Sequence, residues 1–412
     1  MALLRRCESA DRPIEMMRTA LEIVLWLSLA LIVWTQLGYA ALLALLVRIL
    51  RPRGSDAEAA LAAERSGALP TVSLIVAAHD EEGVIGAKVA NALALDYPRE
   101  LLEVIVACDG CSDATAQRAR EAGADLVLEL PRGGKIRAQD AAVAGSRGEI
   151  VAFSDANALW EPGALRALVE AFAEERVGYA CGQVRFFLDA GSASPGAGGA
   201  GATNQEGLYW RYEMALRLAE SRLRSITAGN GAIYATRRES YLVVDPIMGH
   251  DLSFPFNMVK RGWRAVYVPA ARASEKMVPS IEGELARKRR MMSHTWPILL
   301  RGGILSPRGY GPGYALMILS HRLLRYATPF LHALAFAANV ALLVLGAGPL
   351  YLATLLAQLA LLAAAAFGGR LRARPLLVAR YYVLTTAALA LGLWDWLRHG
   401  TSAAWEAAEG TR

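Results

Sequence analysis

The chain has 412 residues, more than one typical domain, and 54% of them are hydrophobic, a high share for a soluble enzyme. The formal net charge of +6 suits anionic lipid or a phosphate-bearing substrate, but the sequence has no basic helix with interleaved aromatic residues, which disfavours nucleic acid as a partner. The four cysteines are too few for a disulfide framework in a chain of this length.

The first element along the chain is a long apolar segment, residues 19–48, which follows an N-terminal segment, residues 1–18. A bilayer core of about 30 Å needs about 20 helical residues, so the apolar segment is long enough to span it. The segment is followed by Arg51, Pro52 and Arg53, which is typical of a membrane exit rather than of a signal-peptide cleavage site. The sequence therefore predicts a transmembrane anchor.

Residues 65–305 alternate short apolar runs with amphipathic stretches and are predicted to form an α/β domain. This βαβα order is typical of a mostly parallel sheet with right-handed crossovers. Ligands bind such sheets beyond the carboxyl ends of the strands, so the residues that follow each strand are candidates for a site. The expected strands are Thr71–Ala78, Leu102–Ala107, Asp125–Leu130 and Glu149–Phe153.

Acidic and amide residues follow three of these strands. Carboxylates at neighbouring strand ends repel one another unless a cation or hydrogen-bond donors lie between them. A hard divalent ion suits such an all-oxygen set. No G-x-G-x-x-G follows the first strand, which disfavours a Rossmann dinucleotide site. The residues are Asp80, Glu81 and Glu82 after the first strand, Asp109 and Asp113 after the second, and Asp155 and Asn157 after the fourth.

The last part of the chain is again apolar. Residues 306–325 are predicted to form an interfacial segment, residues 326–397 three transmembrane helices, and residues 398–412 a C-terminal tail. Arginines at Arg322 and Arg325 indicate the cytosolic side by the positive-inside rule. The α/β domain joins the first span to the second, so we expect it to be cytoplasmic, in a protein of the bacterial inner membrane.

Several stretches, in this order, resemble the family 2 glycosyltransferases of GT-A fold, most closely the membrane-bound branch that makes or decorates polysaccharides and lipids. The resemblance covers nearly the whole chain after residue 65. It implies a GT-A domain that binds a nucleotide sugar, expected to be a UDP-sugar, with Mg²⁺ or Mn²⁺ as cofactor. The stretches include VAAHDEE from Val76, CDGCSDAT from Cys108, GGKIRAQDAAVAGSRGEIVAFSDAN from Gly133, GNGAIY from Gly229 and GWRAVYVP from Gly262, together with Asp251.

The resemblance also implies roles on the donor side. Asp155 and Asn157 stand at the D-x-D position of metal ligands, where the asparagine departs from the stricter pattern and brings no charge. Lys135 is placed to face phosphate, although a solvated surface lysine is the plain alternative. The donor-binding residues implied in this way are Glu81, Asp109, Lys135, Asp155 and Arg290.

Arg290 lies where processive synthases carry a Q-x-x-R-W signature, but the glutamine and the tryptophan are missing here. The arginine can still reach a diphosphate. The basic run 287–290 also fits a second interpretation, a face that lies on anionic headgroups.

On the acceptor side the resemblance aligns Asp251 with the catalytic base of the family, which takes the proton of the attacking hydroxyl. Such a displacement inverts the anomeric centre. Gly229, Asn230 and His250 are expected to contact the acceptor. The alternatives are a tight turn for the two residues of the glycine-rich segment and a purely structural role for the histidine.

We therefore predict a membrane-embedded, inverting, metal-dependent hexosyl- or N-acetylhexosaminyltransferase that acts on a polysaccharide or lipid-linked acceptor. Its partners are the nucleotide sugar, the acceptor, membrane lipids and subunits of an export complex. The alternative is a non-catalytic nucleotide-sugar-binding or transport subunit of such a complex, against which the retained Asp251 argues. Cys108 and Cys111 follow a strand instead of opening a helix, so we expect no redox role.

Overall fold

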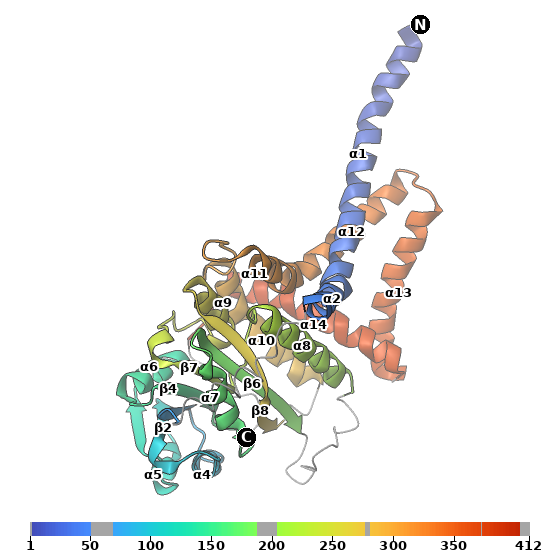
Figure 1. The fold of residues 1–412 in the computed structure, drawn as a ribbon. Helices are drawn as coiled ribbons and strands as arrows, with labels where there is room; N and C mark the ends of the chain where they lie inside the picture. The colour runs from blue at the N-terminus through green and yellow to red at the C-terminus, as the bar shows by residue number, and fades with distance from the viewer. Residues whose placement is uncertain (1, 51–68, 188–203, 277–280, 372, 404–412) are drawn as a thin grey trace. The chain divides into compact units, whose positions relative to one another are not determined.

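The computed structural model describes residues 2–50, 69–187, 204–276, 281–371 and 373–403 (Figure 1). These residues form two compact units. One consists of the chain up to Leu42 together with Leu319–Leu391, and the other of Leu43–Ile318 together with the chain from Gly392 on. The start of the predicted domain, residues 65–68, and most of the predicted tail, residues 404–412, lie outside the described residues.

The larger unit is built on an eight-stranded sheet with the order β3-β2-β1-β4-β7-β6-β8-β5. Strands β3, β2, β1 and β4 are parallel, β7 is antiparallel to both β4 and β6, and β8 is parallel to β6 and antiparallel to β5. This sheet confirms the predicted α/β fold class. The strands are β1 Val72–Ala78, β2 Leu102–Asp109, β3 Leu126–Leu130, β4 Ile150–Asp155, β5 Leu159–Trp160, β6 Val177–Phe187, β7 Ile233–Arg237 and β8 Arg264–Lys276.

Helices cover both faces of the sheet (Figure 1). Because successive strand residues point to opposite faces, β1 supplies both layers of core: Leu74 and Val76 pack on one side and Ile75 on the other, all with 0% exposure. The first side carries α4 Ile85–Leu93, α5 Thr115–Glu121 and α7 Ala164–Glu170, and the second carries α6 Lys135–Gly145, α8 Asn204–Leu223 and α9 His250–Lys260. The unit also contains α10 Ile281–Leu300 and α11 Pro312–Met317.

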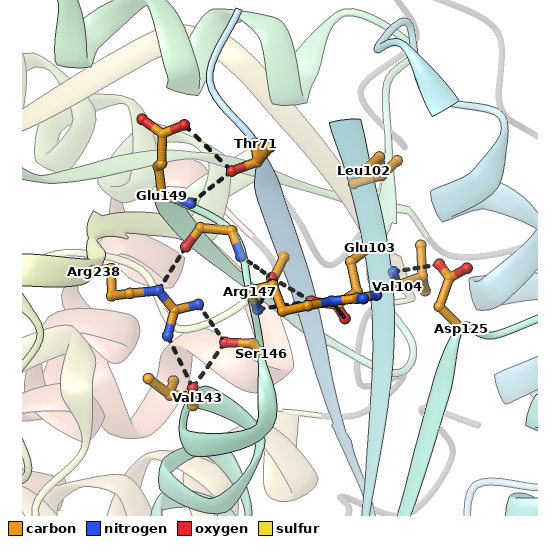
Figure 2. Close-up of polar contacts among 12 residues, drawn as sticks. Thr71, Leu102, Glu103, Val104, Asp125, Val143, Ser146, Arg147, Glu149 and Arg238 are labelled. Atoms are coloured by element: carbon orange, nitrogen blue, oxygen red, sulfur yellow. Dashed lines mark hydrogen bonds and ion pairs between the residues drawn. The ribbon is translucent and has the colours of Figure 1, made fainter. Parts of the chain in front are cut away.

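Polar contacts fasten the amino ends of the central parallel strands (Figure 2). The Arg238 guanidinium donates hydrogen bonds to the carbonyl oxygens of Gly148 (2.7 Å) and Val143 (3.2 Å) and to Oγ of Ser146 (2.8 Å). The N–H of Glu149 donates to Oγ1 of Thr71 at 3.0 Å. These bonds fix the turn from α6 into β4 at the amino end of that strand.

The smaller unit is helical. Its α1 and α12 pack around Leu25, Ala335, Ala338 and Leu342, and Nε1 of Trp34 donates to Oγ of Ser320 at 3.0 Å. Its helices are α1 Ala2–Val33, the first residues of α2 Tyr39–Leu50, α12 Leu324–Val344, α13 Pro349–Leu371 and most of α14 Arg374–His399, with a π-helical turn, Trp34–Gly38, between α1 and α2.

Four helices within the described residues are long and apolar enough to cross a membrane. This agrees with the transmembrane helices of the predicted fold class. The predicted boundaries of the anchor, the interfacial segment and the later spans stay predictions. The four candidate spans are Pro13–Leu50, Pro312–Val344, Pro349–Leu371 and Arg374–His399.

Candidate active site

The sheet brings the predicted carboxylates to one edge. In the register of the parallel strands, Ala78 of β1 lies opposite Cys108 of β2, and Ala77 lies opposite Asp155 of β4. Asp109 is thus the last residue of β2, as Asp155 is of β4. These residues lie at the same edge of the sheet, with β1 between their strands, because parallel strands end on the same side.

Asp109 holds the loop that leads into α6. Its carboxylate, only 1% exposed, accepts hydrogen bonds from the N–H groups of Gly133 (2.6 Å) and Gly134 (3.0 Å) and from Nη1 of Arg132 (3.1 Å). Gly134 has a φ of +95°, which only glycine adopts readily. Asp109 therefore shapes the two-glycine turn that begins α6, and its contact with a nucleoside stays a prediction.

Lys135, the first residue of α6, forms an ion pair between its Nζ and Oδ1 of Asp155. Burial alone would lower the pKa of Lys135, but the carboxylates of Asp155, Asp251 and Glu275 outweigh it and raise that pKa. Lys135 is therefore protonated, contacts Asp155 and lies within electrostatic range of Asp251 and Glu275. This environment differs from that of a solvated surface lysine.

Asp251 lies in the first turn of α9, where the helix dipole favours a carboxylate. Its backbone carbonyl accepts a hydrogen bond from the N–H of Gly229 at 2.6 Å, so the candidate base is joined directly to the glycine-rich segment. A Cβ on Gly229 would lie 1.9 Å from Oη of Tyr179, so only glycine fits. In the same segment, Nδ2 of Asn230 is buried and has no hydrogen-bond partner among the described residues, which leaves a donor for a ligand.

His250, the neighbour of Asp251, is 3% exposed and lies in an aromatic cluster. Its Nδ1 is 2.8 Å from Oη of Tyr234, and its ring stacks on Phe254 with 4.0 Å between ring centroids. Burial, and then the charge of Lys135, lower the pKa of His250 to about 3, so the imidazole is neutral at physiological pH. The cluster fixes the first turn of α9, and a contact between His250 and the acceptor stays a prediction.

The three remaining predicted residues occupy different places. Asn157 lies in the turn between β4 and β5, two residues beyond Asp155. Glu81 is 5% exposed in the turn after β1, where its N–H donates to Oγ1 of Thr115 at 2.7 Å. Arg290 is an exposed residue of α10. Their roles toward donor and metal stay predictions.

Lys88 is a charged residue beside this edge that the sequence analysis missed. It lies on α4 with 0% exposure, and its Nζ donates to the carbonyl of Ala158 at 2.6 Å and lies 5.2 Å from the ring centroid of Trp160. Burial lowers the pKa of Lys88 to about 7, although the nearby carboxylates act in the opposite direction. The sequence feature that could have revealed Lys88 is its position on the same helical face as the apolar Ile85 and Val89.

Glu275, near the end of β8, is the second charged residue that the sequence analysis missed. Burial, together with the charge of Asp155, raises the pKa of Glu275 to about 7, against the effects of Lys135 and Arg287. Arg287 belongs to α10, so this residue of the basic run acts electrostatically on Glu275. The sequence feature that could have revealed Glu275 is a carboxylate at the end of a strand in which buried alanines alternate with other residues.

The family model described as glycosyltransferase-like family 2 matches residues 70–293, more than half of the chain. The chain belongs to glycosyltransferase family 2. This confirms the family resemblance seen in the motifs, and the matched region contains the whole edge described above, from Glu81 to Glu275.

Curated relatives match a shorter segment. A beta-monoglucosyldiacylglycerol synthase of Trichormus variabilis is 37% identical over 122 residues, which are 28% of this chain and 26% of the relative. The synthase of the same name from Synechocystis is 32% identical over 161 residues, 37% of this chain and 33% of the relative. The alignments therefore span only a quarter to a third of these relatives.

A solved structure shows the same fold over most of the chain. It is the mannosyltransferase PcManGT from Pyrobaculum calidifontis in complex with GDP-Man and Mn²⁺, with a TM-score of 0.62 and 21% identity over 93% of this chain and 99% of that one. The fold class is thus a GT-A-like α/β domain combined with candidate membrane-spanning helices.

The oxygen atoms at this edge fit a divalent cation. Asp155 and Asn157 supply a carboxylate and an amide oxygen, the ligand types of Mg²⁺ and Mn²⁺. Oε1 of Glu275 is buried without a hydrogen-bond partner among the described residues, which is the state expected of an oxygen that a cation completes. No cysteine or histidine is needed for this set.

Proposed function

We propose that this chain transfers a sugar from a nucleotide sugar to a lipid or lipid-linked acceptor at the cytoplasmic face of the bacterial inner membrane, with inversion and with a divalent metal as cofactor. The observation that carries the proposal is the ion pair of Lys135 and Asp155, which lies within electrostatic reach of Asp251. A cation for phosphate, a carboxylate for a metal and a carboxylate for a proton thus share one edge of the sheet.

Asp251 serves as the base. Its carboxylate takes the proton of the acceptor hydroxyl as that oxygen attacks the anomeric carbon from the face opposite the diphosphate, and this geometry inverts the centre. The hydrogen bond from Gly229 to the Asp251 carbonyl fixes the backbone of the base, and the preceding residue, the neutral His250, is held by Tyr234 and Phe254. With its pKa lowered to about 3, His250 has little tendency to take up a second proton at neutral pH, so the proposal assigns the base role to the Asp251 carboxylate.

The leaving nucleotide develops negative charge on its diphosphate. Lys135 is protonated and can shift from Asp155 to a phosphate oxygen, so it stabilises that charge. Asp155 and Asn157 would hold the metal, which supplies further charge neutralisation when bound. Asp109 supports the role of Lys135, because it fixes the glycine turn that precedes this lysine.

A lipid acceptor is favoured over a growing polysaccharide by three observations. The matched curated relatives are named as synthases of a glucosyldiacylglycerol, and the described chain contains four candidate membrane spans. The glutamine and tryptophan of the processive signature are absent around Arg290. Polysaccharide extension is the second candidate, and product length separates the two.

The test uses the full chain purified in detergent or nanodiscs with Mn²⁺. Candidate donors, beginning with UDP-sugars and including GDP-mannose, are screened for nucleotide release with diacylglycerol or with polyprenyl phosphate as acceptor. We expect release and a labelled lipid product with at least one pair. If wild-type protein releases no nucleotide with any donor and a membrane lipid extract, the enzyme proposal fails, and nucleotide binding without release favours the non-catalytic subunit instead.

A further inference from the structure

Glu275 is a half-buried residue of β8 with one carboxylate oxygen, Oε1, that is buried. It lies on β8 two residues beyond Ala273 and four beyond Ala271, both of which are 0% exposed. Because side chains alternate along a strand, Glu275 lies on the same face of the sheet as these two alanines. Its Oε1 is shielded from solvent and has no hydrogen-bond partner among the described residues. A buried polar oxygen without a partner is destabilising, so a ligand is expected at this position.

The strand register places Glu275 against the turn that carries the D-x-N pair. Leu159 of β5 lies opposite Ser274, so the next step of this antiparallel pairing puts Glu275 beside Ala158, directly after Asn157. The electrostatic coupling of Glu275 with Asp155 and Lys135 agrees with this placement.

The turn that carries Asp155 and Asn157 has fewer negative charges than a divalent cation favours. Asp155 supplies one carboxylate, whereas Asn157 supplies an uncharged amide, so the D-x-N pair has one negative charge fewer than two aspartates would provide. Hard divalent cations bind through several oxygens and favour carboxylates. Two carboxylates at one turn repel each other unless a cation lies between them. In this structure the ammonium of Lys135 contacts Asp155.

We propose that Glu275 supplies the second carboxylate of the metal site, in place of the charge that Asn157 lacks. The inference rests on the proposed function, because it names a further residue of the same donor site. The competing interpretation is that Glu275 only balances the buried charge of Lys88 and the nearby Arg287, which predicts lower stability but no specific loss of metal affinity.

The test measures Mn²⁺ binding directly. Full-length protein in detergent is titrated with Mn²⁺ in the presence of UDP or GDP, and bound Mn²⁺ is followed by electron paramagnetic resonance against a protein-free blank. We expect Glu275→Gln to weaken Mn²⁺ binding roughly tenfold or more. Glu161→Gln is the matched control, because Glu161 lies just after β5 but pairs with Arg185 and Arg272. It should leave Mn²⁺ affinity unchanged.

A rescue variant separates charge from folding. Adding Asn157→Asp to Glu275→Gln restores the second carboxylate and should recover most of the lost affinity. If Glu275→Gln does not fold, as judged by its melting curve, Glu275→Asp provides the measurement, and shortening the side chain should still weaken Mn²⁺ binding. Mn²⁺ affinity equal to wild type in a folded Glu275 variant overturns the inference. Wild-type protein that binds no Mn²⁺ with either nucleotide overturns the proposed function itself.

Discussion

The Nζ of Lys135 pairs with Oδ1 of Asp155, so the residue expected to face phosphate contacts the residue expected to hold the metal. Lys135 begins α6 and Asp155 ends β4, and the two meet because both lie at the carboxyl edge of the sheet. A metal ion bound as proposed would compete with the ammonium group for this carboxylate. We therefore expect a bound donor to draw Lys135 toward its phosphates as the cation takes its place on Asp155.

Replacing Lys135 by methionine should affect the donor and the metal in opposite directions. The KM for the nucleotide sugar should rise about tenfold or more, because a charged hydrogen bond to phosphate is lost. Mn²⁺ binding without nucleotide should tighten, because Asp155 loses its competing cation. Lys135→Arg, which keeps the charge, is the control and should change both quantities less. An unchanged KM together with unchanged Mn²⁺ affinity would contradict the competition.

The sequence allowed the four parallel strands of the sheet to be predicted, and with them the edge at which Asp109 and Asp155 lie. Long apolar runs such as Thr71–Ala78 are typical of strands buried on both faces, and the structure has β1 at Val72–Ala78. Because parallel strands end together, the positions of Asp109 and Asp155 follow from their strands alone. A local pattern was therefore enough to place these residues on the same edge.

Other parts of the site depend on contacts that no local pattern reveals. Glu275 reaches the edge only because β8 pairs with β5, and that pairing joins segments more than a hundred residues apart. Lys88 interrupts an apolar helical face, but its partner, the carbonyl of Ala158, comes from a distant turn. The buried histidine cluster likewise combines Tyr234 and Phe254 from separate elements. Long-range pairing decided these positions.

Asp251→Asn should abolish most turnover while leaving donor binding intact. The amide keeps the size of the side chain but cannot accept the proton of the acceptor hydroxyl, so kcat should fall by about 10²–10⁴. The dissociation constant for the nucleotide with Mn²⁺ should change by less than about threefold, since the metal ligands stay in place. Rates come from nucleotide release and binding from calorimetry. Full turnover in the variant would mean that another group serves as the base.

His250 should make the fold less stable at acidic pH. Its pKa in the folded protein, about 3, lies below the ordinary value of about 6.5, so the unfolded chain binds a proton that the folded chain excludes. Stability is therefore unaffected above about pH 6.5 and declines as the pH falls from there toward 3, by about 1.4 kcal/mol per pH unit for this group.

The measurement for His250 compares melting temperatures of wild type and His250→Gln at several pH values between about 7.5 and 5. The variant removes the titrating ring, so its melting temperature should fall less steeply on acidification. Phe254→Leu weakens the same cluster without removing a titrating group, and it should keep the wild-type slope. Equal slopes for wild type and His250→Gln would show that the ring takes up its proton in the folded state as well.

Arg238→Met should lower stability without touching the donor site. The guanidinium donates to the carbonyls of Val143 and Gly148 and to Ser146, all at the amino end of the strands (Figure 2). Losing these charged donors should cost about 2–3 kcal/mol in the free energy of unfolding, or roughly 5–10 °C in melting temperature.

Arg166→Met, which removes an exposed ion pair with Asp96, is the control for Arg238→Met and should shift the melting temperature by less than about 2 °C. Because the bonds hold the end of β4 opposite Asp155, the KM for the donor should stay within about twofold of wild type below the melting range. A large rise in that KM would instead show that this network positions Asp155.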